Sequence, residues 1–550
     1  MFGMIWLLTL ACFNDYNSGV DPDGDGAPWP EDCDSTNPNI HPGAPELCDQ
    51  IDQDCDGALW DPDDLIGVVT VSNSEDYPGA LRSSITAGLA EAGAGGTVCV
   101  APGMYREAVT LEAPVTLLSL AGAEETGVQP QDSFTQVMRI LPGAAGSTVR
   151  GFTLTGGDTP GGEGLPSSCG GGLVVRGDAT LESLNITGNG GFEGAGLCVL
   201  AGDVTLTDSV ISFNTSVGAG GGVEVYLDPD DPQPAHLTMN DVRVELNEAR
   251  LWGGGVYVHA QTLTATLIVV EGNVITEGGW GAGVAALESA DLTLNDVRIW
   301  SNSFGASGTG GAGGLYAAPY SDDPEEKVPT VRGERVDIRD NRPPTGGLGG
   351  ALVCVGCQLT MSNMIVAGNS GDRILGIEVY DNTVSLDHLT VVGNQGQIYA
   401  GGLDVYFDGE QPASVSRSTF FQNTGEAPAI NISFNSEDAL IAQLSAFDEV
   451  HHDQNSVEFD ASAYGDAASG FFTDCTPTFV SLTGEPTTWD LHLTDADRCL
   501  TTGAVELGAY GGAGGEAGPP SPPGPNASAD TYSASSAATA DVTPAASPPG

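Results

Sequence analysis

The chain is poor in positive charge. It has 16 Lys and Arg residues against 74 Asp and Glu residues, a formal net charge of −58, and Lys327 is its only lysine. Such an acidic surface repels the phosphates of nucleic acids and the headgroups of anionic lipids. Nucleic acids and anionic membrane surfaces are therefore excluded as partners, and cations are favoured.

Long apolar runs are also missing. No stretch approaches the roughly 20 apolar residues that span a bilayer. A short apolar run precedes Cys12, and Leu8–Cys12 resembles a bacterial lipobox, in which the Cys is lipidated. We interpret residues 1–12 as a signal peptide with a lipobox, although Thr9 stands where Leu is usual. A conventional signal peptide is the alternative, and both predict the cell envelope, outer membrane surface or medium of a Gram-negative bacterium.

One sequence motif recurs nine times along the chain. An Ile, Val or Phe is followed by two variable residues, an Asn, and usually a glycine pair before a short strand. The Asn residues are Asn189, Asn214, Asn247, Asn273, Asn302, Asn341, Asn369, Asn394 and Asn423. They lie roughly 25 to 39 residues apart, a period that indicates one coil of a stacked solenoid per repeat.

The residue types in this motif explain why the chain would coil. The branched or aromatic residue points inward, and the Asn lies at a turn where its amide can bond to the Asn of the next coil. Segments such as Val223–Tyr226 and Leu403–Tyr406 then alternate apolar and polar residues, as half-buried strands do. We predict an all-β, right-handed, single-stranded parallel β-helix over 65–512, expected to be monomeric, and a disordered Gly/Ala/Pro/Ser tail over 513–550.

The 11 cysteines support export. Without Cys12, ten remain, an even number that can form disulfides in an oxidising compartment. The local candidate pairs are Cys48 with Cys55, Cys354 with Cys357, and Cys475 with Cys499. Cys354 and Cys357 could instead form a redox or zinc pair, but a second ligand pair at metal spacing is missing.

Acidic side chains are densest in residues 13–64. One calcium-type loop, with glycine at position six, has acids at positions one, three, five and twelve: Asp21, Asp23, Asp25 and Asp32. A second loop repeats this spacing with Asp52, Asp54, Asp56 and Asp63. Ca²⁺ takes six to eight oxygen ligands, which alternate carboxylates around a glycine turn can supply. We therefore predict a metal-binding module over 13–64.

The same segment resembles a known repeat. The runs Glu31–Asp34, Asn37–Asp49 and Ile51–Gly57 are similar to the metal-binding repeat of bacterial cell-surface proteins, a family named after a methanotroph surface protein that chelates copper. The resemblance implies metal binding. Oxygen-only ligands favour Ca²⁺, whereas copper, the alternative, would need His41, Trp29 or Trp60.

The rest of the chain resembles right-handed parallel β-helix proteins of the pectin-lyase-like group. In that group a short helix, here 81–92, plugs the first coil, and Gly96–Glu107 matches the first-coil signature. Trp489–Leu493 and Val505–Gly512 resemble the closing coils. A weaker likeness, through Phe420/Asn423 and Gly349–Leu352, is to the repeats of chlamydial polymorphic outer-membrane proteins, which are adhesins.

Two function classes remain. The favoured hypothesis is a calcium-binding head on a β-helix rod that binds an extracellular glycan or a cell-surface partner; the alternative is a polysaccharide lyase or glycoside hydrolase. Enzymes of these classes need converging carboxylates or an Arg or Lys base. Glu224, Glu378 and Asp404, each with a Tyr two positions on, recur as strand positions that we expect to face solvent, so we name no catalytic residue.

Overall fold

The computed structural model describes most of the chain between 21 and 407. The described residues are 21–49, 51–59, 65, 67–159, 169–228, 233–305, 309–319, 328–343, 349–371, 376–380, 383–396 and 401–407, with short segments from 413 to 493. Cys12, Asp63, Trp60, Cys475, Cys499, Val505–Gly512 and the predicted tail lie outside them.

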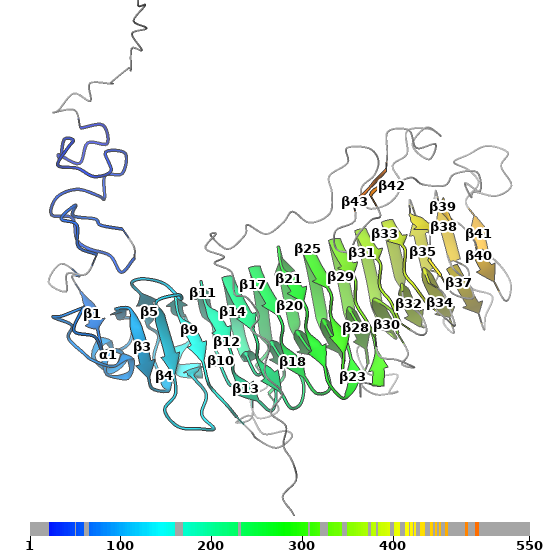
Figure 1. The fold of residues 1–550 in the computed structure, drawn as a ribbon, viewed down its shortest axis with the longest axis horizontal. Helices are drawn as coiled ribbons and strands as arrows, with labels where there is room; N and C mark the ends of the chain where they lie inside the picture. The colour runs from blue at the N-terminus through cyan, green and yellow to red at the C-terminus, as the bar shows by residue number, and fades with distance from the viewer. Residues whose placement is uncertain are drawn as a thin grey trace, which may run out of the picture. The chain divides into compact units, whose positions relative to one another are not determined.

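Parallel strands stack coil upon coil along the chain (Figure 1), which confirms the predicted parallel β-solenoid. The first sheet holds β1 (Val68–Val71), β2 (Thr97–Val100), β3 (Gly103–Arg106), β5 (Thr116–Ser119), β6 (Thr126–Gln129), β8 (Ser147–Arg150), β9 (Thr153–Thr155), β11 (Ala179–Glu182), β12 (Asn185–Thr187), β14 (Leu197–Ser212), β17 (Ala235–Glu245), β20 (Thr262–Thr266), β21 (Val269–Glu271), β25 (Asp291–Trp300), β29 (Thr330–Arg339), β31 (Gln358–Ala367), β33 (Val384–Val392), β35 (Ala413–Ser416), β36 (Thr419–Phe421), β38 (Leu440–Gln443), β39 (Ala446–Phe447) and β41 (Val457–Phe459).

A second sheet forms another side of each coil, and β14 contributes to both sheets. It holds β4 (Val109–Leu111), β7 (Met138–Ile140), β10 (Leu173–Arg176), β16 (Val223–Tyr226), β19 (Val256–His259), β24 (Val284–Leu287), β28 (Leu315–Ala318), β30 (Leu352–Val355), β32 (Ile377–Tyr380), β34 (Leu403–Phe407), β37 (Ile430–Phe434) and β40 (Val450–His452). Short strands form two further small sheets. One consists of β13 (Gly190–Gly191), β15 (Thr215–Ser216), β18 (Glu248–Ala249), β22 (Val274–Ile275) and β26 (Ser303–Phe304), and the other of β23 (Gly278–Trp280) and β27 (Thr309–Gly311).

Apolar side chains in register fill the inside of the coils. Val204, Leu237, Leu263, Leu292 and Val331 pair in succession along the first sheet, and all are at most 1% exposed. The residues between them on each strand point outward and are polar. This period-two alternation, read through the register, places one continuous core inside the coils.

The recurrent Asn residues form a ladder of hydrogen bonds through the coils. From Asn189 to Asn423, each side-chain amide donates to the Oδ1 of the next Asn at 2.8–3.1 Å. Each also donates to a backbone carbonyl of the preceding coil, as Asn302 does to Val270 at 3.0 Å. These side chains are at most 4% exposed, so the ladder satisfies amides that burial would otherwise leave without partners.

The helix at the start of the solenoid is shorter than expected. α1 spans Ile85–Ala92, and Ser84 caps it by accepting from the Ala87 amide. Glu107 of the first coil accepts from the Ile85 and Thr86 amides at 2.7 and 2.9 Å, so a carboxylate lies at the positive end of the helix. The other helix in the described residues is the short η1 (Pro142–Ala144), and none there is long and apolar enough to cross a bilayer.

One expected closing coil is wrong. β43 (Asp490–Leu493) pairs antiparallel with β42 (Phe479–Ser481), whereas the coils pair in parallel. The described parallel ladder reaches β41, which pairs with β38. An alternating strand pattern fixes which side chains share a face but not the direction of the partner strand, so the sequence signature could not distinguish the two arrangements.

The described part of the chain contains four disulfides, and one predicted pairing is wrong. Cys48 pairs with Cys99 of the first coil and Cys55 pairs with Cys33, so Cys48 and Cys55 do not pair with each other. Cys354 pairs with Cys357 as predicted, which excludes a dithiol metal site there, and Cys169 pairs with Cys198. Closeness in sequence misled the prediction because the chain folds Cys48 against the solenoid.

Candidate functional site

The first acidic loop wraps its backbone around one carboxylate. Asp21 Oδ1 accepts from the Gly24 amide at 2.7 Å and Asp21 Oδ2 from the Gly26 amide at 2.9 Å. Gly26 has a φ of 99°, which side chains rarely allow, so glycine is needed where the loop reverses. Carboxylate oxygens of Asp21, Asp23 and Asp25 lie within 4.8 Å of one another as a result.

The second loop repeats this geometry. Asp52 Oδ2 accepts from the Gly57 amide at 2.8 Å, and Asp54 Oδ1 accepts from the Asp56 amide at 3.1 Å. Gly57 also has a positive φ, 89°. The equal spacing of position one and the glycine at position six therefore produces the same turn twice.

Glu46 completes the second cluster, and sequence reasoning missed it. Its carboxylate lies within 4.8 Å of those of Asp52 and Asp54, and it is 3% exposed. Glu46 Oε1 accepts from the Gln53 and Asp54 amides at 2.8 and 3.0 Å. The spacing of the second loop is counted from Asp52 and cannot include a residue six positions earlier. The one available signal for Glu46 was its place inside the repeat that the sequence resembles.

Several carboxylate oxygens in the module have no hydrogen-bond donor. Asp23 Oδ2, Asp25 Oδ2, Asp32 Oδ2 and Glu46 Oε2 are buried and accept no hydrogen bond. Asp32, the twelfth residue of the first loop, is only 1% exposed. Buried oxygens without a donor cost free energy, and in such a cluster a cation removes that cost.

The carboxylates also disturb one another electrostatically. Desolvation raises the pKa of Asp23, and the negative charges of Asp25 and Asp32 raise it further. Desolvation raises the pKa of Glu46 too, and Asp54 and Asp52 add to the shift. Both loops therefore hold more negative charge than their surroundings stabilise, which is the electrostatic condition for cation binding.

Other predicted ligands lie differently. Asp56 is exposed and accepts from the Ala58 amide, and it is not part of the group formed by Glu46, Asp52 and Asp54. His41 contacts the Pro42 carbonyl, and Trp29 is 45% exposed. Within the described part of the module, the metal-ligand groups contain only oxygen donors.

A further group of acidic residues, outside the module, lies on the outer face of the second sheet. Glu224, Glu378 and Asp404 occupy one row, together with Tyr257 and Tyr316. We expected this position to face solvent, and that expectation is wrong: Glu224 is 0%, Glu378 1% and Asp404 9% exposed. A period-two pattern separates inside from outside, but it does not show what packs against the outside.

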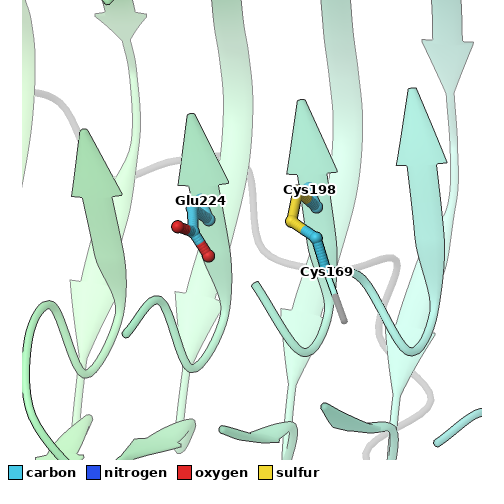
Figure 2. A group of neighbouring side chains, drawn as sticks. All are labelled: Cys169, Cys198 and Glu224. Carbon is cyan, nitrogen blue, oxygen red and sulfur yellow. A yellow bond between two sulfur atoms is a disulfide. The ribbon is translucent and has the colours of Figure 1, made fainter. Parts of the chain in front are cut away.

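Glu224 is the most deeply buried of these acids. It projects from β16 beside the Cys169–Cys198 disulfide (Figure 2), and neither of its oxygens has a hydrogen-bond partner. Burial, and then the charge of Glu193, raises its pKa well above the usual range. Burial without a hydrogen-bond donor therefore favours the protonated form of the Glu224 carboxyl group.

Comparisons with known proteins agree with the module. A family model described as "Putative metal-binding motif" (Cu-binding_MopE) matches residues 32–59, which include Glu46, Asp52 and Asp54. No curated protein sequence matches this chain significantly. The motif match covers the group of Glu46, Asp52 and Asp54 completely, and of the first loop it includes only the twelfth position, Asp32.

Solved structures share low similarity with the chain. They include pectate lyase Pel9A (13% identity, 81% of this chain and 96% of that chain, TM-score 0.32) and the A-module of the mannuronan C-5 epimerase AlgE6 from Azotobacter vinelandii (15%, 70% and 93%, 0.33). Another is the catalytic domain of a GH87 alpha-1,3-glucanase (11%, 74% and 68%, 0.28). None of these scores carries an activity over to this chain.

The disulfides indicate the compartment, because they persist only in an oxidising environment. Four are formed among the described residues, two of them holding residues of the module. Together with the matched motif, they indicate an extracellular or cell-surface protein. The chain thus carries a metal-binding motif ahead of a parallel β-solenoid.

Proposed function

We propose that this chain is an exported cell-surface protein in which a calcium-binding module over 13–64 precedes a β-helix that binds a glycan. One observation carries the calcium assignment. Asp32 Oδ2 and Glu46 Oε2, both on residues at most 3% exposed, have no hydrogen-bond donor. Glu46 lies in the group with Asp52 and Asp54, and the charge of Asp32 raises the pKa of Asp23 in the other group.

Calcium fits these residues better than copper does. Ca²⁺ accepts six to eight oxygen ligands in flexible geometry, whereas copper prefers imidazole or sulfur donors. Asp21, Asp23, Asp25 and Asp32 would hold one ion, and Glu46, Asp52 and Asp54 another. The bound ions would offset the desolvation and, after it, the mutual repulsion that raise the pKa values of Asp23 and Glu46.

The remaining parts of the proposal concern location. Residues 1–12 would direct export, and lipidation of Cys12 would anchor the protein at the outer membrane surface. The solenoid over 65–512 would then present its outer faces to the surroundings. The net charge of −58 of the whole chain keeps it away from anionic lipid surfaces, so attachment would depend on the lipid.

Metal content of the purified protein tests the calcium assignment. We expect about two equivalents of Ca²⁺ by mass spectrometry, one for each loop. The quadruple variant Asp21→Ala, Asp25→Ala, Asp52→Ala and Asp56→Ala should lose them, while Glu31→Gln, an exposed neighbour outside both clusters, should keep them. Copper in place of calcium, or no metal, would overturn the assignment.

Single substitutions separate the two sites. Asp32→Asn should remove the ion of the first loop and leave the second, and Glu46→Gln should do the reverse, each measured by calorimetric titration with Ca²⁺. Both substitutions keep side-chain size and remove one buried negative charge. Loss of both ions from either variant would contradict two separate sites.

We favour binding over catalysis for the solenoid because its recurrent acids are inaccessible. A general acid must reach the substrate oxygen to within hydrogen-bond distance. Glu224 and Glu378 are at most 1% exposed, so neither reaches a bound glycan in this conformation. Release of reducing ends from a glycan, abolished by Glu224→Gln, would replace the binding role with a hydrolytic one.

A further inference from the structure

A buried carboxyl group faces a disulfide on the outer side of the second sheet. Glu224 of β16 is fully buried, and neither of its oxygens has a hydrogen-bond partner. The register pairs Glu224 with Cys198 of β14, and Cys198 is bonded to Cys169 (Figure 2). The Cys169 and Cys198 sulfurs and a Glu224 oxygen all lie within 4.8 Å of one another. Two sulfurs and one carboxyl group therefore converge on the same small volume.

The neighbouring coils show that this row of the sheet does not need an acid. The successive residues of the row are Val174, Cys198, Glu224, Tyr257, Ala285, Tyr316 and Val353. Glu224 carries the one carboxyl group among these seven. An apolar side chain would fill the position without the cost of burying oxygens that have no donor. The unpartnered oxygens of Glu224 therefore point to an ion that the group can bind.

Two glycines leave the room that this arrangement needs. A Cβ atom at Gly194 would lie 3.2 Å from Glu224 Oε2 and 3.0 Å from the Cys198 Cβ. A Cβ atom at Gly170 would lie 3.1 Å from the same Cys198 atom. Both glycines have positive φ values, 53° at Gly194 and 69° at Gly170. The backbone thus carries no side chain at the two places where one would crowd the group.

The surroundings of the two sulfurs are apolar. Cys169 and Cys198 belong to a buried cluster with Val174 and Leu200, against which the partly buried Tyr226 packs. Cys169 is only 3% exposed, and Cys198 is fully buried. Thiolates and a carboxylate cannot be held in such surroundings unless a positive charge compensates them. A metal cation supplies that charge.

We propose that Cys169, Cys198 and Glu224 bind one zinc ion when the Cys169–Cys198 disulfide is reduced. Zn²⁺ accepts thiolate sulfur and carboxylate oxygen in one tetrahedral site, whereas Ca²⁺ takes oxygen ligands. Three protein ligands leave the fourth position to water. The proposal goes beyond the proposed function, because it concerns another metal and another part of the chain.

The site forms in two steps. Thiol–disulfide exchange with an external dithiol breaks the bond between Cys169 and Cys198; the dithiol becomes a disulfide, and its two protons and two electrons pass to the two sulfurs. Zn²⁺ then replaces three protons, one from each thiol and one from the Glu224 carboxyl group. Reoxidation restores the disulfide and releases the ion. The disulfide and the zinc complex exclude each other, so the redox state of the surroundings selects between them.

Zinc content before and after reduction tests the site. The full-length protein is reduced with a phosphine, which becomes a phosphine oxide, then incubated with zinc chloride and desalted. We expect the reduced wild type to retain about one equivalent of zinc more than the reduced double variant Cys169→Ser, Cys198→Ser, by mass spectrometry. This difference is decisive because the phosphine also reduces the other disulfides. Equal zinc contents of the two reduced proteins, or the same difference between the two oxidised proteins, would overturn the proposal.

Cobalt tests the carboxyl group as a ligand. Thiolate-bound Co²⁺ absorbs in the near ultraviolet, and the absorption of this site is the difference from the double cysteine variant. Glu224→Gln should weaken the Co²⁺ binding that produces it by at least about tenfold. Glu288→Gln is the matched control, at an acid that contacts His259 and lies outside the group, and should leave the affinity unchanged. Equal Co²⁺ affinity of the wild type and Glu224→Gln would remove the carboxyl group from the site.

Melting temperatures separate a lost ligand from a lost fold. Zinc should raise the Tm of the reduced wild type more than that of the reduced double cysteine variant, because bound metal stabilises the folded state. An equal increase in both proteins would place the zinc elsewhere and overturn the proposal. The calcium of the module is measured on the oxidised wild type, so failure of either metal assignment leaves the other standing.

Discussion

The acidic module and the solenoid achieve order in different ways. In the described residues of the module no helix or strand occurs, and its backbone amides bond largely to Asp, Asn and Glu side chains. In the solenoid, parallel strands bury a continuous apolar core and an Asn ladder. The comparison teaches that one chain uses charge and disulfides where it cannot bury a core, and burial where it can.

The largest difference should appear when the disulfides are removed. Cys48→Ser with Cys99→Ser opens a 51-residue separation and should lower the free energy of unfolding of the module by about 4 kcal/mol. Cys354→Ser with Cys357→Ser opens a separation of three and should cost much less. Hydrogen exchange of residues 21–59 measures the first effect, and equal costs for both pairs would remove the distinction.

Removal of calcium should produce the second-largest difference in stability between the module and the solenoid. A ligand present at 100 times its dissociation constant stabilises the folded state by about 2.7 kcal/mol. Chelation should therefore reduce protection in residues 21–59 about a hundredfold and leave the melting of the solenoid nearly unchanged. A large drop in the main melting transition would mean that the stabilising metal lies in the coils.

The Asn ladder gives an effect specific to the solenoid. Asn302→Ala removes hydrogen bonds to Asn341 and to the Val270 carbonyl at a fully buried position and should cost about 1–3 kcal/mol. Asn240→Ala, at an exposed position of the first sheet, is the matched control and should cost under about 0.5 kcal/mol. Denaturant unfolding measures both, and equal costs would show that the ladder contributes nothing.

The smallest effect concerns pH. The pKa of Glu224 is raised in the folded protein, so between its ordinary value of 4.5 and the raised value the folded state keeps a proton that the unfolded chain releases. Its contribution to stability is complete below about pH 4.5 and is lost as the pH rises, at most about 1.4 kcal/mol per pH unit. Glu224→Gln should flatten this slope in the solenoid.

The module should respond to pH in the opposite sense when calcium is present. The raised pKa values of Asp23 and Glu46 mean that protons compete with calcium as the pH falls. Calcium affinity should therefore decrease from pH 7 towards pH 5, as calorimetric titration would show. Affinity independent of pH would exclude these two carboxylates from the metal sites.

Much of the solenoid could be predicted because its information is local and repeated. The alternation around Leu237 and Leu263 identifies the inward face, and the Asn spacing fixes one coil for each repeat. The disulfide partners of Cys48 and Cys55 could not be predicted, because loop spacing contains no record of which coil the module contacts. The antiparallel pairing of β43 could not be predicted either, because an alternating strand pattern does not fix the direction of the partner strand.

The sequence by itself determined the parallel β-helix, the two Asp–Gly turns and the surplus of acids, since each depends on residue type at a fixed spacing. Only the tertiary structure decided that Glu46 joins Asp52 and Asp54, and that Glu224 is buried beside a disulfide instead of facing solvent. The burial of Glu224 depends on segments that are distant in the chain and adjacent in space, whereas Glu46 reaches Asp52 and Asp54 through the hydrogen bonds of its carboxylate to the Gln53 and Asp54 amides. Burial and charge at such positions arise when the coils and the module pack, and the strand period does not encode them.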